Sequence, residues 1–150
     1  MKWVTRTNVR LDRVAMIWLI KRVIDPNAEI VLLPEAEAQE YAEEQGATLF
    51  HHPKAEMRNT GFRTGFDAMI TKYELADPAL VLMQMALRGA ETTDRTLTPW
   101  STGIRAIGLG LRSLHAEDER FIEEMSRVFD GLYQFCQDQL APVDPKSAKD

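Results

Sequence analysis

The chain has 150 residues, of which 45% are hydrophobic and 27% charged, and this is typical of one soluble globular domain. Its formal net charge of −5 at pH 7 argues against direct nucleic-acid binding, which needs positive charge to neutralise phosphates. The single cysteine, Cys136, excludes a disulfide within the chain and fits a reducing cytoplasm. No apolar stretch approaches the length of a membrane span, so we expect a cytoplasmic protein without membrane contact. The composition leaves the oligomeric state open.

Alternating strands and helices are predicted over the first third of the chain. Short apolar or β-branched runs, closed by polar residues or proline, predict strands at residues 2–6, 29–33 and 48–52. Helices are predicted between them, at residues 12–25 and 35–45. This order is typical of a small, mostly parallel sheet with right-handed crossovers.

The helix at residues 12–25 is expected at the centre of the fold. Asp12 is predicted as its N-cap, and Pro26 is predicted to end it. Residues 14–20 are all apolar, so the helix should be buried on several sides. Trp18 is expected in the core. The two charged ends of this helix are therefore places where a site could be held against a fixed scaffold.

Four helices joined by polar loops are predicted over the second half of the chain. The helices are expected at residues 66–73, 78–87, 99–114 and 117–140. Segments 54–65 and 89–99 are predicted loops, and long loops of this kind are often functional. The predicted fold class is therefore α/β and helix-rich, with a helical C-terminal half packed on the small sheet. We expect one domain over residues 1–141 and a polar, frayed tail over residues 142–150.

Basic residues at the start of the central helix form a first candidate site. Arg6 and Arg13 flank Asp12, where free backbone amides and the helix dipole favour an anion. A small anion bound by Arg6, Asp12 and Arg13 is one interpretation. The alternative is that both arginines pair with the glutamates of residues 35–44 and cover apolar surface.

His51 and His52 stand at the end of the third predicted strand. Neighbours on a strand point to opposite faces, so at most one of them can face a site, and the alternative is that both are surface residues. The sequence has no motif of nucleophilic, nucleotide-binding or zinc-protease chemistry, and Cys136 lies on the apolar face of the last helix. The residues alone therefore leave open whether the protein is an enzyme.

The two polar loops are expected to meet at the edge of the sheet where parallel strands usually hold their ligands. Such a pocket would set Glu56 against Glu91, two like charges that repel unless a cation or an arginine lies between them. Arg58 and Arg88 are the alternative to a metal ion. The further pocket candidates are polar residues of the strand end and the two loops: His51, His52, Asn59, Arg88 and Asp94.

Five stretches of the chain, in order, carry a resemblance to a known family. They are TR at residues 5–6, DRVAMIWLIKRVIDP at 12–26, RGAET at 88–92, GIRAIGLGL at 103–111 and FDGLYQFC at 129–136. Together they resemble the C-terminal domain family of the chromate-resistance protein ChrB. The resemblance implies a cytoplasmic protein associated with chromate resistance or a metal-stress response. Longer members carry an additional N-terminal regulatory domain. Because this chain begins at the shared domain, we do not expect it to read DNA.

The resemblance also implies a candidate metal site. The family's loop has a glutamate followed by a histidine pair, whereas this chain has EMRNTG at residues 56–61, with Asn59 and Thr60 in place of the histidines. Glu91 stands where the family usually has aspartate in RGAD. If the family's histidines bind a metal, this protein either lacks that ligand or uses a histidine of the strand end. Glu56 and Glu91 then remain as ligands for Mn²⁺, Mg²⁺ or Zn²⁺, and their oxygen donors suit the first two better.

Three functional hypotheses follow. The first is a ChrB-like cytoplasmic domain that binds a metal ion or an oxyanion in a metal-stress response. The second is an uncharacterised metal-dependent enzyme of hydrolase type, which would use Asp12, Glu56 and Glu91 around a divalent ion. The third is a non-catalytic interaction module. An enzyme needs these carboxylates to converge in one concave pocket, and carboxylates scattered over the surface would leave only the third.

Overall fold

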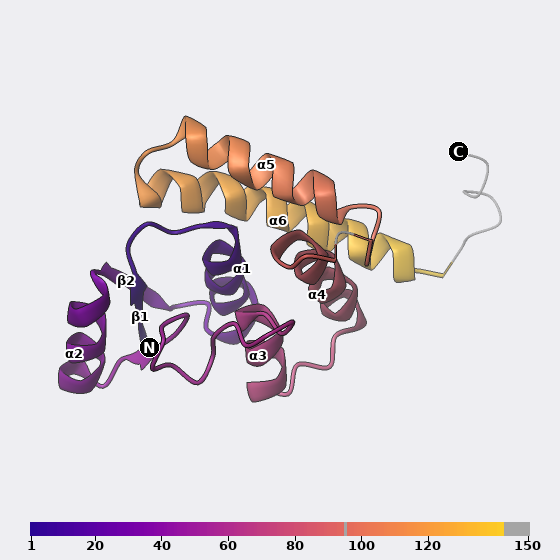
Figure 1. Ribbon diagram of the computed structural model, residues 1–150. Coiled ribbons are helices and arrows are strands. Elements are labelled where there is room, and N and C mark those ends of the chain that lie inside the picture. Colours follow the sequence, from indigo (N-terminus) through magenta and orange to yellow (C-terminus); the bar gives the residue numbers. More distant parts are fainter. Residues whose placement is uncertain (95, 143–150) are drawn as a thin grey trace.

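A computed structural model describes residues 1–94 and 96–142 of the chain. The predicted tail lies outside the described residues except for its first residue. Figure 1 shows a small sheet at one end, a group of helices in the middle and an antiparallel pair of long helices across that group. Within the described part of the chain, no helix is long and apolar enough to cross a membrane.

Three parallel strands form the sheet. They are β1 (Lys2–Arg6), β2 (Glu29–Leu33) and β3 (Thr48–Leu49), in the order β2-β1-β3. Val4 of the central strand pairs with Val31 on one side and with Leu49 on the other. The predicted small parallel sheet is confirmed, but β3 is shorter than the predicted residues 48–52. It ends early because His51 has a φ of 46°, which is incompatible with an extended strand.

Helix α1 (Leu11–Leu19) continues as the π-helical segment η1 (Ile20–Ile24). Asp12 is not the N-cap that the sequence predicts, because the helix begins one residue earlier and Arg10 occupies the cap position. Asp12 lies in the first turn, where its Oδ1 accepts a hydrogen bond from the backbone N–H of Arg13 at 2.8 Å. Its other carboxylate oxygen is therefore left for side chains of neighbouring segments.

The core is built around α1. Residues 14–20 are all buried, which confirms the predicted central helix. Trp18 is 2% exposed, and its indole N–H donates to Asp130 at 2.7 Å. Large aromatic side chains from the strands and helices around it are fully buried as well: Trp3, Phe50, Phe66, Phe121 and Phe129. The start of α1 is thus fixed on a close-packed scaffold.

Five further helices confirm the helix-rich class. They are α2 (Glu35–Gln45), α3 (Gly65–Lys72), α4 (Pro78–Glu91), α5 (Ser101–Leu114) and α6 (Asp118–Leu140). α4 is longer than the predicted residues 78–87, so Arg88 and Glu91 lie on a helix and not in a loop. Gly89 lets α5 approach this last turn, because a Cβ there would lie 2.3 Å from the hydroxyl of Ser101. The packing therefore places Glu91 against α5.

Candidate functional site

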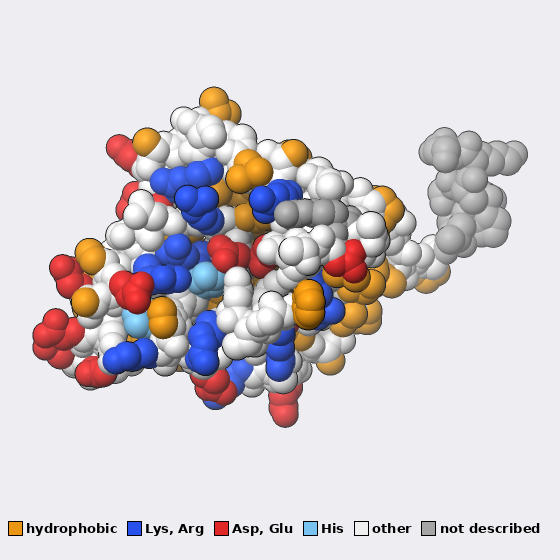
Figure 2. Space-filling view, viewed as in Figure 1, with side chains coloured by type: hydrophobic (Ala, Val, Ile, Leu, Met, Phe, Trp, Pro, Cys, Tyr) orange, Lys and Arg blue, Asp and Glu red, His pale blue; other side chains and the backbone are white. Residues whose placement is uncertain are grey.

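Two cavities adjoin the end of α4. The larger, of about 190 Å³, lies between the loop before α1, the end of α4, and helices α5 and α6. The smaller, of about 160 Å³, lies between residues 59–64 and residues 91–93. Glu91 lines both, and Asp12 lines the larger one. Figure 2 shows basic side chains (lysine or arginine) around a few acidic ones in the middle of this face.

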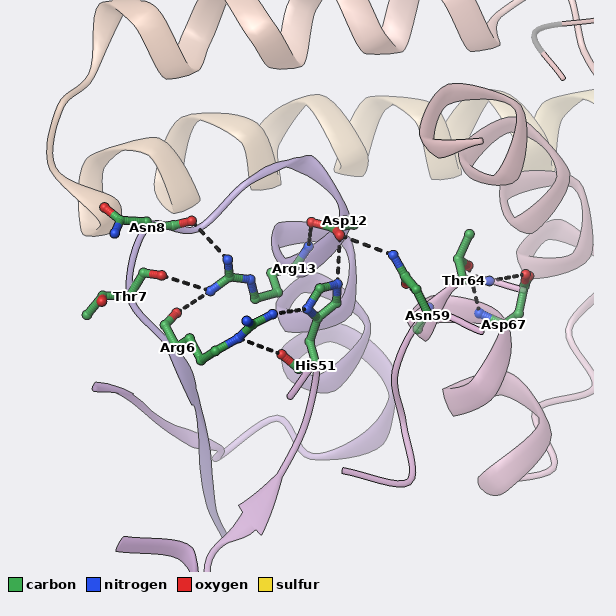
Figure 3. Close-up of polar contacts among 10 residues, drawn as sticks. Arg6, Thr7, Asn8, Asp12, Arg13, His51, Asn59, Thr64 and Asp67 are labelled. Atoms are coloured by element: carbon green, nitrogen blue, oxygen red, sulfur yellow. Dashed lines mark hydrogen bonds and ion pairs between the residues drawn. The ribbon is translucent and has the colours of Figure 1, made fainter. Parts of the chain in front are cut away.

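Arg13 holds the loop between β1 and α1 in place. Its side chain is buried, and its guanidinium donates to the backbone carbonyls of Arg6, Thr7 and Asn8 (Figure 3). The bonds to Thr7 and Asn8 measure 3.0 and 2.9 Å. These donors are used by the protein itself, so the contacts of Arg13 do not favour the anion site predicted at this residue.

Arg6 makes the ion pair that the alternative interpretation predicts. Its Nη1 lies 3.1 Å from a carboxylate oxygen of Glu35, the first residue of α2. Its Nε donates to the carbonyl of His51 at 3.3 Å, and its Nη2 lies 3.5 Å from Nδ1 of the same residue. Arg6 thus connects β1 to α2 and to the His51 backbone. An anion bound by Arg6 and Arg13 stays a prediction.

His51 and Asn59 hold the carboxylate of Asp12 from two sides (Figure 3). His51 Nε2 lies 2.6 Å from Asp12 Oδ2, and the Asn59 amide donates to the same oxygen at 3.3 Å. Because Arg6 can only donate, His51 Nδ1 is assigned as an acceptor and Nε2 carries the proton that faces Asp12. Burial raises the pKa of Asp12, but the interactions with His51 and Arg13 together outweigh burial, so the net pKa lies below its ordinary value. Asp12 is therefore ionised near neutral pH.

His52 has a structural role. It is 3% exposed; its Nε2 donates to the carbonyl of Glu35 at 2.9 Å, and its Nδ1 accepts the backbone N–H of Lys54 at 3.1 Å. The surface position weighed for both histidines is therefore wrong for His52. His51 has a left-handed backbone conformation, which is uncommon for a residue other than glycine, and its ring lies beside Asp12.

Glu91 differs sharply from Asp12. Both of its carboxylate oxygens are buried, and neither has a hydrogen-bond partner among the described residues. Burial, together with the nearby charges of Asp12 and Asp67, raises the pKa of Glu91 well above its ordinary value. Burial without a donor thus favours the protonated form of Glu91, which has an O–H to donate. Glu91 and the ionised carboxylate of Asp12 line one cavity.

Asp67 and Arg88 form a pair beside these groups. Asp67 is 1% exposed and forms a capping box with Thr64 at the start of α3. Arg88 donates from Nε to Asp67 Oδ2 at 3.2 Å, and its Nη2 lies 3.2 Å from Oδ1. Arg88 therefore neutralises Asp67 and not the Glu56–Glu91 pair. The spacing of Thr64 and Asp67 before an apolar run is a capping-box signal that could have pointed to Asp67.

The expected pairing of Glu56 with Glu91 is wrong. The exposed carboxylate of Glu56 lies 2.9 Å from Lys72 Nζ, at the end of α3, and Glu56 lines neither cavity. The loops still approach each other, because Asn59 lines the smaller cavity with Glu91. Asn59 is held there by its Oδ1, which accepts the backbone N–H of Gly65 at 2.7 Å. This bond brings the middle of the loop, and not Glu56, to the site.

The remaining loop candidates make local contacts. Asp94 is exposed, and its Oδ1 accepts hydrogen bonds from the backbone N–H and the hydroxyl of Thr96 at 3.0 and 2.6 Å. Arg58 donates to the carbonyl of Ala55. Neither Asp94 nor Arg58 lines either cavity. Both side chains therefore close turns within their own loops.

Three arginines that sequence reasoning missed line the larger cavity. The side chain of Arg10 has no hydrogen-bond or ion-pair partner among the described residues. Arg105 Nη1 lies 3.5 Å from the carbonyl of Ala90, a long bond, whereas Arg112 pairs with Asp118 at 2.9 Å. Arg105 and Arg112 are seven residues apart on α5, a helical spacing that could have indicated one shared face. Arg10 and Arg105 thus supply positive charge that other side chains leave available.

The described residues do not fit a divalent cation well. Among them, no group of three or more His, Cys, Asp or Glu side chains is placed to hold a metal ion. Asp12 is already held by His51, and the charges of Arg10 and Arg105 would repel a cation at the same cavity. This donor set favours a negatively charged ligand.

Fold and cavity together define a helix-rich α/β domain with a charged cavity at the start of its central helix. The chain belongs to the ChrB C-terminal domain family, whose family model matches residues 3–136. It is similar to Protein ChrB of Cupriavidus metallidurans, with 26% identity over 133 residues. The match covers 88% of this chain and 40% of that relative, so the chain spans less than half of the relative's length. No solved structure gives a significant match.

Proposed function

We propose that this domain binds a small tetrahedral oxyanion in the larger cavity, as part of a cytoplasmic response of the chromate-resistance type associated with its family. One observation carries the proposal. Arg10 and Arg105 line the same cavity as Glu91, a buried carboxyl without a hydrogen-bond partner among the described residues and with a raised pKa. Positive charge and an O–H donor at one cavity are what an oxyanion needs.

The charges of the cavity support an anion over a cation. Asp12 is the one ionised acidic side chain among the described lining residues, and His51 and Asn59 already donate to it. The positive charges of Arg10 and Arg105 therefore outweigh the negative charge of Asp12. A volume of about 190 Å³ also exceeds the roughly 30 Å³ share of one water molecule several times, so an ion of this class fits. The proposed site keeps Asp12 from the first candidate site and replaces Arg6 and Arg13 by Arg10 and Arg105.

Calorimetric titration of chromate into the full chain tests the proposal, at a mildly acidic pH at which chromate carries a proton. Arg105→Ala removes one rim charge, and we expect its chromate affinity to fall about tenfold, because a charged hydrogen bond contributes roughly 1.5–3 kcal/mol. Arg120→Ala is the matched control: Arg120 lies on α6, pairs with Glu124 at 3.0 Å and lines neither cavity. Equal loss of affinity in both variants would indicate non-specific charge attraction and would contradict the site.

A divalent cation is the second candidate ligand. It is supported by the unpartnered carboxyl of Glu91 and by the two charges near it, Asp12 and Asp67. Titration of Mn²⁺, Mg²⁺ and Zn²⁺ into chelator-treated protein distinguishes it from the anion. Binding that is lost in Glu91→Gln and retained in Glu56→Gln would favour the cation and, with it, the hydrolase-like alternative. If the protein binds neither chromate nor a metal ion, the remaining hypothesis is the non-catalytic interaction module.

A further inference from the structure

The acidic lining of the larger cavity consists of two groups with opposite hydrogen-bonding roles. Among the described residues that line it, Asp12 and Glu91 are the acidic ones. Asp12 accepts hydrogen bonds from three groups and, as a carboxylate, can only accept. Glu91 has no donor within reach among the described residues, and a buried charge without a partner is far more costly than a neutral carboxyl. The cavity therefore offers one acceptor and one O–H donor.

We infer that the Asp12–Glu91 pair selects tetrahedral oxyanions that carry a proton over oxyanions that carry none. The inference rests on the proposed oxyanion site and specifies its ligand class. The O–H of the ligand donates to Asp12, and an unprotonated oxygen of the ligand accepts from the O–H of Glu91. Arg10 and Arg105, which line the same cavity, balance the remaining negative charge.

An oxyanion without a proton meets Asp12 unfavourably. It presents only acceptors, so an oxygen of the ligand and an oxygen of Asp12 would face each other with no hydrogen between them. Both oxygens carry negative charge, and at least one is left without a donor in a buried place. Discrimination of this kind comes from the unpaired group and not from the size of the ligand.

Asp12 cannot avoid this contact by turning away. Its carboxylate is held by the Arg13 backbone N–H at 2.8 Å, by His51 at 2.6 Å and by Asn59 at 3.3 Å. His51 is in turn positioned by Arg6, which contacts both its carbonyl and its ring (Figure 3). An acceptor that is fixed before the ligand arrives discriminates best, because no reorganisation relieves the clash.

The second nearby carboxylate does not offer an alternative acceptor in this cavity. Asp67 is 1% exposed and is neutralised by Arg88. It lines neither of the two cavities that adjoin Glu91. Among the described residues, the ionisable side chains that line one or both of these cavities are Arg10, Asp12, Arg63, Glu91, Arg105 and Arg112. Asp12 is therefore the carboxylate that would accept the proton-bearing oxygen of the ligand and so select protonated oxyanions.

Inorganic phosphate and sulfate are the probes that test this inference. They have the same shape, but near neutral pH phosphate carries at least one proton and sulfate carries none. We expect calorimetric titration of the full chain at matched ionic strength to show phosphate binding at least about tenfold tighter than sulfate. This comparison needs no variant, so it does not depend on how a substitution affects folding.

Two variants separate the roles of the pair. Asp12→Asn supplies an amide that can also donate, so the preference for phosphate should fall to within about twofold as sulfate binding improves. Glu91→Gln keeps a donor of similar shape, so the preference should remain. Thermal melts of both variants establish that they are folded before titration. A preference that survives in Asp12→Asn would overturn the role of Asp12.

The outcomes also separate this inference from the proposed function. Equal affinity for phosphate and sulfate in the unsubstituted protein overturns selection and leaves the oxyanion site standing. No binding of phosphate, sulfate or chromate overturns both. Tighter binding of sulfate than of phosphate also overturns selection, because it would show that Asp12 does not face the ligand.

Discussion

The two ends of the central helix contain similar charged residues but use them differently. At the C-terminal end the acidic side chains of Asp25 and Asp130 both have partners. Asp25 accepts from the Trp3 indole at 3.0 Å and pairs with the chain's amino group, and Asp130 accepts from Trp18 and from Arg22, each within 2.9 Å. These carboxylates connect the sheet and α6 to the helix. This end is built for stability.

At the N-terminal end the pairing is incomplete. Asp12 is held by donors from three directions, but Glu91, which lines the same cavity, has none among the described residues. The side chain of Arg10 likewise has no partner in the described part of the chain. The acidic groups Asp25 and Asp130 are thus paired at one end of the helix, whereas a buried carboxyl and an arginine side chain stay without partners at the other.

The largest effect is expected at the C-terminal end. Trp18→Ala should lower the free energy of unfolding by about 3–5 kcal/mol, because it leaves a large cavity in the core and removes the hydrogen bond to Asp130. Denaturant unfolding followed by circular dichroism measures it. A melting temperature within a degree or two of that of the unsubstituted protein would contradict the central role of α1 in the core.

A smaller loss of stability is expected from Asp12→Asn, because this substitution leaves His51 without a charged acceptor. The free energy of unfolding should fall by about 2 kcal/mol at pH 7. Asp12 has a pKa below its ordinary value in the folded protein, so its stabilisation is present above the unfolded pKa of 3.8. It is lost as the pH falls through the lower, folded pKa. The two proteins should therefore converge in stability at acid pH, and a difference independent of pH would contradict the assignment.

Glu91→Gln should change the free energy of unfolding in the opposite direction, towards greater stability. The folded pKa of Glu91 is raised, so the folded protein must keep a proton that the unfolded chain releases above its pKa of 4.5. Stability is therefore lost with rising pH between the unfolded and the folded pKa, and the glutamine variant avoids this loss. We expect Glu91→Gln to be about 1 kcal/mol more stable at pH 7 and to lose this advantage below pH 4.5 in chemical denaturation. A destabilised variant at pH 7 would indicate a partner for the ionised Glu91.

The smallest effect is expected from Arg22→Ala. Arg22 pairs with Asp130 at 2.9 Å, but both side chains are almost half exposed, so water and salt screen the pair. The loss should be about 0–1 kcal/mol and should shrink further when thermal melts are repeated at high salt. A loss as large as that of Trp18→Ala would make the ion pair, and not the packing, the main contact at this end.

Local sequence patterns predicted most of the fold. The order of strands and helices, the parallel sheet and the burial of Trp18 follow from apolar periodicity and from the positions of proline and glycine. The errors are at element ends. β3 stops at Leu49 and α4 continues to Glu91, because a left-handed residue at His51 and a close approach of α5 at Gly89 depend on contacts that local propensity does not contain.

The candidate site shows the same division. The sequence by itself marked Asp12, His51, Asn59 and Glu91 as candidates from their polar setting and from the family resemblance. Only the tertiary structure decided that Asp12 is paired whereas Glu91 has no partner among the described residues, and that backbone carbonyls occupy the side chain of Arg13. The physical reason is that the protonation state of a carboxyl depends on burial and on the donors around it. Those donors come from segments far apart in the chain, so only folding brings them together or keeps them apart.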